Sequence, residues 1–152
     1  MSPLAIGLYL DVSYQSPQSQ KSFRKVKACK LAAASPRVAL ADPCIAGLFA
    51  HYITALAPWY DLNDSQRTFG TVVPQNGLDC PILFKAIIAF SASHMSRTEN
   101  SMQEIASAFH TACVQGFLKL INEVQPRSHG NELAATCLLR SYEIIDGKFV
   151  HR

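Results

Sequence analysis

The most constraining feature of this 152-residue sequence is an amphipathic segment that meets a proline. Apolar residues recur in it at steps of three and four, which is the spacing of one face of an α-helix. These residues are Ile45, Leu48, Phe49, Tyr52, Ile53 and Leu56. Asp42-Pro43 predicts the start of the helix, because an aspartate caps free N–H groups and a proline at the first helical position loses no hydrogen bond. Pro58 disfavours helical backbone at Ala57, so we expect the helix to stop there.

Three further segments predict helices. The segment near 81–96 is apolar around most of its circumference, which predicts a central helix packed on several sides. The segment near 101–124 has one apolar face, and a last amphipathic segment lies near 131–145. Before the first of these, 70–78 contains a proline and an Asn-Gly turn, so we expect an extended linker there. The predicted fold class is all-α, with about four main helices in an antiparallel-type array.

The large apolar side chains on these faces are the expected structural core. The tryptophan beside the helix stop is flanked by apolar residues, and we expect it to plug the core. The core candidates are Leu48, Tyr52, Trp59, Phe90, Phe109 and Phe117. Gly116 lies within the third helix, where a missing side chain allows close packing of a neighbouring helix.

The first forty residues differ in character from the rest. They carry six Lys or Arg and one acidic residue, whereas the remainder carries eight basic and ten acidic residues. Residues 13–22 are rich in Ser and Gln, which favours disorder. We therefore expect 1–40 to be a basic, flexible tail, 42–147 to be the helical domain and 148–152 to be a short second tail. The basic run at 23–30 admits four alternatives: a solvated tail, a nuclear-import signal, non-specific phosphate contacts or part of a transit peptide.

No pattern in the sequence predicts catalysis. The seven glycines are scattered, so no phosphate-binding loop is present, and no serine lies between glycines. His94 follows Ser91 and Ser93, but adjacent helical positions do not face each other and no nearby acid is placed to orient the ring. We expect the five histidines to be structural or solvent-facing. We also expect no enzyme activity, no catalytic or cofactor-binding residue and no small-molecule substrate.

The five cysteines do not form a metal or disulfide pattern, because they stand at least 15 residues apart. Zinc sites and disulfide frameworks need closely spaced or evenly paired cysteines. We expect Cys44, Cys80, Cys113 and Cys137 to act as small buried hydrophobes, with no metal ligands in the chain. No apolar run reaches the roughly 20 residues that span a bilayer, so we expect no membrane contact.

Residues 48–146 resemble the fungal-specific transcription factor domain, the helical regulatory region that follows the binuclear zinc-cluster module in fungal regulators. The resemblance rests on the order and spacing of short strings, which match the start of that domain over about two-thirds of the chain. The strings are Leu48-Phe49-Ala50-His51-Tyr52-Ile53, Leu56-Ala57-Pro58-Trp59-Tyr60-Asp61-Leu62-Asn63-Asp64, Phe69, Val72-Val73-Pro74, Cys80-Pro81-Ile82-Leu83, Ala86-Ile87-Ile88-Ala89-Phe90-Ser91-Ala92-Ser93-His94, Ser96-Arg97, Ala134-Ala135-Thr136, Leu138-Leu139-Arg140 and Glu143.

The resemblance implies an all-α regulatory fold and a nuclear role in RNA polymerase II transcription, with the cytoplasm as the alternative location. Zinc belongs to the family's DNA-binding module, which needs six closely spaced cysteines, so we expect neither zinc nor direct DNA binding here. Two hypotheses follow: a fragment of a transcription regulator that acts through protein contacts, or a self-contained helical module that binds proteins or dimerises. A small enzyme is a third hypothesis, and it requires a pocket that joins His94 to a carboxylate.

Overall fold

The computed structural model describes residues 16–123 and 129–147, and every regular element in these ranges is helical. The predicted all-α class is therefore confirmed. The elements are α2 (Pro17–Ala33), α3 (Pro36–Ala39), α4 (Pro43–His51), a π-helical turn (Tyr52–Leu56), α5 (Ala57–Tyr60), α6 (Val72–Gly77), α7 (Pro81–Met95), α8 (Met102–Ile121) and α9 (His129–Asp146). The four expected helices are α4 with its continuation, α7, α8 and α9. The predictions for 1–15 and 148–152 lie outside the described residues.

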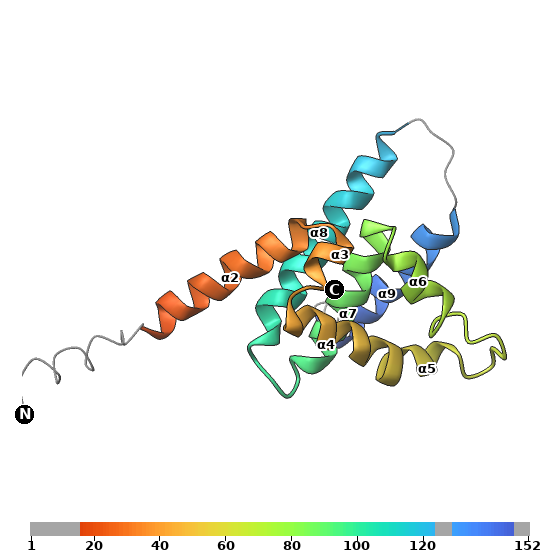
Figure 1. Cartoon of the computed structure of the whole chain (residues 1–152), viewed down its shortest axis with the longest axis horizontal. Helices are drawn as coiled ribbons and strands as arrows, with labels where there is room; N and C mark the ends of the chain where they lie inside the picture. Colours follow the sequence, from red (N-terminus) through yellow and green to blue (C-terminus); the bar gives the residue numbers. More distant parts are fainter. Residues whose placement is uncertain (1–15, 124–128, 148–152) are drawn as a thin grey trace, which may run out of the picture.

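Helix α7 is the centre of the domain, as its all-round apolar character predicts. Figure 1 shows it surrounded by α3, α4, α6, α8 and α9, while α2 projects from this group. Phe84 and Ile88 of α7 belong to a buried cluster with residues of α2, α3, α4 and α8. Leu83 and Ile87 belong to a second cluster with residues of the π-helical turn, α6 and α9. Within 16–123 and 129–147, no helix combines the length and apolar character needed to cross a membrane.

The start of α4 is built as the sequence predicts. The Asp42 carboxylate accepts hydrogen bonds from the backbone N–H groups of Cys44 (2.9 Å) and Ile45 (3.3 Å), and Pro43 occupies the first helical position. The same carboxylate lies 3.0 Å from the Lys27 ammonium, which ties α2 to α4. Burial by itself raises the pKa of Asp42, but Lys27 and the two N–H groups outweigh it and hold this pKa below its ordinary value.

The structure corrects the expectation of a flexible tail for residues 17–33, which form α2. The helix begins where Ser16 Oγ accepts from the N–H of Ser19, and it ends before Pro36. Ala28 and Ala32 are buried on its inner side, where α2 packs against α8. These two alanines are enough to anchor the helix on α8, and its basic residues remain exposed to solvent.

The expected linker at 70–78 is also corrected, because it contains α6. Pro74 is the third residue of this helix, where its missing N–H has no intrahelical partner to lose. Val73 is buried, and a Cβ on Gly77 would lie 3.0 Å from Ile87 Cδ1, so α6 packs closely on α7. The signals taken for a linker therefore belong to a short helix held by tertiary packing.

Candidate protein-interaction surface

The helix that begins at Pro43 does not stop at Ala57 but changes geometry before Pro58. The N–H of Ala57 donates to the carbonyl of Tyr52, five residues earlier, in a π-helical turn. Pro58 has no N–H, and in a regular α-helix its ring clashes with the carbonyl of Thr54, four residues before it. A wider turn relieves this clash. The helix then continues as α5 and ends at Tyr60, so the predicted stop at Ala57 is wrong.

The π-helical turn decides which side chains face the core. In an uninterrupted α-helix, Trp59 would share the face of Leu48 and Tyr52, because these positions recur at the helical spacing. The extra residue in the turn rotates everything after it by roughly a quarter turn. Ala57 therefore becomes fully buried, and Trp59 is 53% exposed. The prediction that Trp59 plugs the core is wrong for this reason.

The other core candidates lie on the interior side of their helices. Leu48, Tyr52, Phe90 and Phe109 are buried, at 4% exposure or less. Phe117 is half-buried and packs against the cluster that includes α9. Ser91 is buried as well, and its hydroxyl donates to the carbonyl of Leu48 (2.7 Å), which makes it a link between α7 and α4.

The inner edge of Trp59 is held by two rings of α7. Its ring lies edge-on to Phe90, with centroids 6.5 Å apart, and edge-on to His94, with centroids 5.5 Å apart. These tilted arrangements match the preferred geometry of aromatic pairs. Tyr60 stacks on Phe69 with centroids 4.5 Å apart. Trp59 is therefore fixed along one edge while its other side faces solvent.

The loop after α5 holds this cluster in place. The Asp61 carboxylate accepts hydrogen bonds from the N–H groups of Phe69 (2.9 Å) and Gly70 (2.8 Å). The Tyr52 hydroxyl donates to the carbonyl of Phe69 (2.9 Å). These bonds fix the chain on both sides of the ring that stacks on Tyr60.

A small pocket of about 250 Å³ opens beside Trp59. Its lining residues come from α5, α7 and α9, and they are Trp59, Tyr60, Phe90, Ser141, Ile144 and Ile145. The Tyr60 hydroxyl donates to the carbonyl of Cys137 (3.3 Å) and also contacts the Ser141 hydroxyl, so these polar groups satisfy one another. Burial raises the pKa of Tyr60, which stays neutral. The pocket is therefore uncharged and mostly apolar, with exposed Ile144 at its rim.

Next to Trp59 the structure brings together two histidines that lie 43 positions apart. His51 Nε2 and His94 Nδ1 are 3.0 Å apart, so one ring donates a hydrogen bond to the other. Burial, and then the nearby His94, lower the pKa of His51. Sequence reasoning missed this pair, because no local spacing relates the end of α4 to the end of α7.

The cysteines do not gather in space. Cys113 is buried, its thiol donates to the carbonyl of Ile82 (3.3 Å), and burial raises its pKa to about 12. The expectation of burial is corrected for Cys44, Cys80 and Cys137, which are half-buried, while Cys29 is exposed. Within the described part of the chain, no three His, Cys, Asp or Glu residues lie close enough to hold a metal ion.

The fold thus defines an all-α domain with an aromatic, uncharged surface pocket. The chain belongs to the fungal specific transcription factor domain family, whose model matches residues 47–151, and this confirms the resemblance predicted for 48–146. It is also similar to sterol uptake control protein 2 of Saccharomyces cerevisiae, with 27% identity over 94 residues. That match covers 60% of this chain and 10% of the relative, so the chain spans about a tenth of the relative's length. No solved structure matches the chain.

Proposed function

We propose that this chain acts in the fungal nucleus as a protein-binding part of a transcription regulator. Membership in a family of transcription factor domains supports the regulatory role and the nuclear location. The matching segment makes up only 10% of its yeast relative, and this supports a role as one part of a larger protein. The proposal assigns the chain no catalysis, no cofactor and no direct contact with DNA.

The half-exposed Trp59 above an apolar pocket is the observation that carries the proposal. Tryptophan and tyrosine dominate the energetic centres of protein interfaces, where they lie beside pockets that a partner side chain fills. No charged residue lines this pocket. Its natural occupant is an aliphatic or aromatic side chain of a partner protein.

The size of the pocket favours a protein side chain over a small molecule. Small-molecule sites enclose roughly 300–1,000 Å³ and bury most of their ligand. The pocket of about 250 Å³ beside Trp59 is smaller and open to solvent on the side of Ile144.

A reporter assay tests the proposal. The chain is fused to an unrelated DNA-binding module in a fungal host, and transcription of a reporter gene is measured with a fluorescent tag that shows location. We expect the tagged chain to accumulate in the nucleus and to change the reporter output. Trp59→Ala and Ile144→Ser should each abolish the change in reporter output. Leu133→Ser is the matched control, because Leu133 is equally exposed on α9 but does not line the pocket.

Circular dichroism of each variant separates loss of contact from loss of fold. An unchanged reporter signal, or an equal loss with Leu133→Ser, contradicts the proposal. Exclusion of the tagged chain from the nucleus contradicts the proposed location.

Self-association is a second candidate, supported by an exposed stripe on α8. Val114, Leu118 and Ile121 are exposed at steps of four and three residues, which is the spacing of a helix–helix seam. A second copy of the chain presents the same stripe, so the two can pair face to face. Sedimentation tests this, and we expect Leu118→Glu with Ile121→Glu to convert a dimer to a monomer. A wild-type chain that is monomeric at every concentration excludes this candidate.

A further inference from the structure

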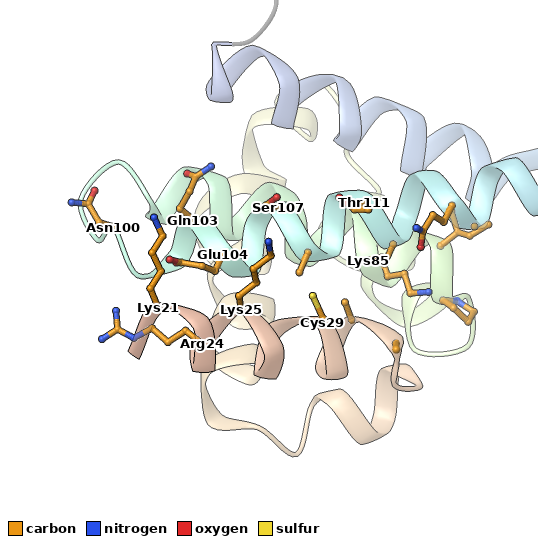
Figure 2. A pocket seen from close by; sticks show the side chains of 18 of the residues that line it. Lys21, Arg24, Lys25, Cys29, Lys85, Asn100, Gln103, Glu104, Ser107 and Thr111 are labelled. Carbon is orange, nitrogen blue, oxygen red and sulfur yellow. The ribbon is translucent and has the colours of Figure 1, made fainter. Parts of the chain in front are cut away.

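A second surface, distinct from the Trp59 pocket, lies between α2 and α8. The two helices and the start of α7 enclose a groove of about 1280 Å³, which shares no residue with the pocket beside Trp59 (Figure 2). The sequence gives no sign of a groove here, because its local patterns favour a flexible tail where α2 forms.

The walls of the groove carry an excess of positive charge. Five cationic side chains line it, against the single carboxylate of Glu104. The five are Lys21, Arg24, Lys25, Lys85 and Lys119. Within the described residues, none of them forms an ion pair with a carboxylate, whereas Lys27 and Arg37, outside the groove, pair with Asp42 and Asp79. The groove is thus a concave site whose positive charge is not neutralised by the described chain.

The floor of the groove is made of small and apolar residues. The residues here called the floor are Ile82, Ala108, Ala112 and Gly116, all of which line the groove. A ligand that contacts this floor needs an apolar side of its own, since only apolar surface gains from burial there. A simple anion leaves this floor uncovered, whereas an amphipathic segment covers it.

The length of the groove suits a peptide. Gln103 and Lys119 both line it on α8, and sixteen residues of α-helix span about 24 Å. Figure 2 shows Lys21, Arg24 and Lys25 at the end of the groove near Gln103, while Lys85 lies toward the other end. Positive charge therefore lies toward both ends of the groove, so a segment that fills it needs acidic residues along its whole length.

Glu104 favours a peptide, which carries an N–H at nearly every backbone position, over the phosphate groups of a nucleic acid. One oxygen of its carboxylate is buried and has no hydrogen-bond partner among the described residues. A phosphate backbone has no donor for this oxygen and is repelled by its charge. A peptide can offer a backbone N–H, a hydroxyl or a lysine, and such a bond removes the cost of the unsatisfied oxygen.

We infer that the groove between α2 and α8 binds an acidic, amphipathic segment of a partner protein. The cationic walls hold the carboxylates, the apolar floor takes the apolar side of the segment, and Glu104 accepts a hydrogen bond from it. This surface and the partner chemistry that suits it both differ from those of the Trp59 pocket.

Fluorescence anisotropy with a defined probe tests the inference. The probe is a labelled peptide of about 14 residues, four helical turns, with glutamates along one side and leucines along the other. We expect saturable binding that weakens with added salt. In Lys21→Glu/Lys25→Glu we expect Kd to rise about tenfold or more, since two charge pairs are reversed. Lys30→Glu/Arg97→Glu is the control with the same change in net charge outside the groove, and we expect it to change Kd by less than about twofold.

Three comparisons keep the outcome clear. A peptide with glutamine in place of glutamate must bind more weakly, and Trp59→Ala must leave peptide binding unchanged, which separates this groove from the functional proposal above. No binding of the acidic peptide overturns the inference, as does an equal loss in the control variant. Tighter binding of a single-stranded oligonucleotide than of the peptide, strengthened by Glu104→Gln, also overturns it and assigns the groove to nucleic acid.

Discussion

The N–H of Ala57 donates to the carbonyl of Tyr52, five positions earlier, and this π-helical hydrogen bond sets the direction in which Trp59 faces. It buries Ala57 completely and leaves Trp59 53% exposed beside a pocket. π-Helical turns of this kind are often found at functional sites, because they re-aim the side chains that follow. The interaction surface proposed for this chain depends on that local change of geometry.

Deletion of Thr54 tests whether Pro58 causes the π-helical turn. Thr54 is exposed within the turn, so its removal returns the segment to α-helical spacing and keeps both flanking faces in register. We expect a cost of about 3 kcal/mol, because Pro58 then lies inside a regular helix. Adding Pro58→Ala to the deletion should restore stability to within about 1 kcal/mol of the parent in urea unfolding.

Deletion of Gly47 is the matched control for this experiment. Gly47 is exposed in α4, but its removal rotates Ile45 away from the core, and we expect no cooperative unfolding transition. If the Thr54 deletion alone leaves stability unchanged, the proline is not the cause of the turn.

Trp59→Ala should destabilise the chain far less than truncation of a buried aromatic residue. We expect about 1–2 kcal/mol for Trp59, since roughly half of its surface is already in water. Phe90→Ala, at 1% exposure, should cost about 3–5 kcal/mol. Urea unfolding measures both values, and equal costs would show that Trp59 lies in the core after all.

The His51–His94 pair predicts a loss of stability as the pH falls. The folded pKa of His51 lies below 6.5, so between about pH 7 and pH 5 the unfolded chain binds more protons than the folded chain. The free energy of unfolding therefore decreases as the pH is lowered through this range. His51→Gln removes this titration, and we expect its curve of stability against pH to be flatter there. A parallel curve for the variant would rule out His51 as the source.

Asp42 has two separable contributions to stability. Asp42 is the N-cap of α4, so Asp42→Ala should lower the free energy of unfolding by about 1 kcal/mol in thermal or urea unfolding. Asp42→Asn keeps the cap and should cost less. The ion pair with the exposed Lys27 should add about 0.5 kcal/mol or less, measured by a double-mutant cycle with Lys27→Ala. Because the folded pKa of Asp42 is lowered, its contribution is present above about pH 4 and is lost as the pH falls further.

Gly47 and Gly116 should respond in opposite directions to substitution by alanine. A Cβ at Gly47 would meet open space, so Gly47→Ala should stabilise α4 by about 0.5–1 kcal/mol through helix propensity. A Cβ at Gly116 would lie 2.9 Å from Ile82 Cγ1, so the contact of α8 with α7 must shift. Overpacking of this kind costs about 1–3 kcal/mol and outweighs the same propensity gain. Stabilisation by both substitutions would show that α8 and α7 are not closely packed.

Local patterns predicted the helical scaffold well. Asp42-Pro43 marks the start of α4, the apolar segment near 81–96 is the central helix α7, and Gly116 does lie at a close helix contact. These features depend on capping, periodicity and side-chain size, all of which act over a few residues. Helix α2 was missed because its burial depends on two alanines that meet α8, a contact no local pattern reveals.

The sequence by itself determined an all-α fold and the family to which the chain belongs. Only the tertiary structure decided which way Trp59 faces, that His51 meets His94, and that a basic groove lies between α2 and α8. The physical reason is the range of the forces involved. Helix periodicity and capping are local properties of the chain, whereas a turn of altered geometry and contacts between distant helices arise only when the core packs.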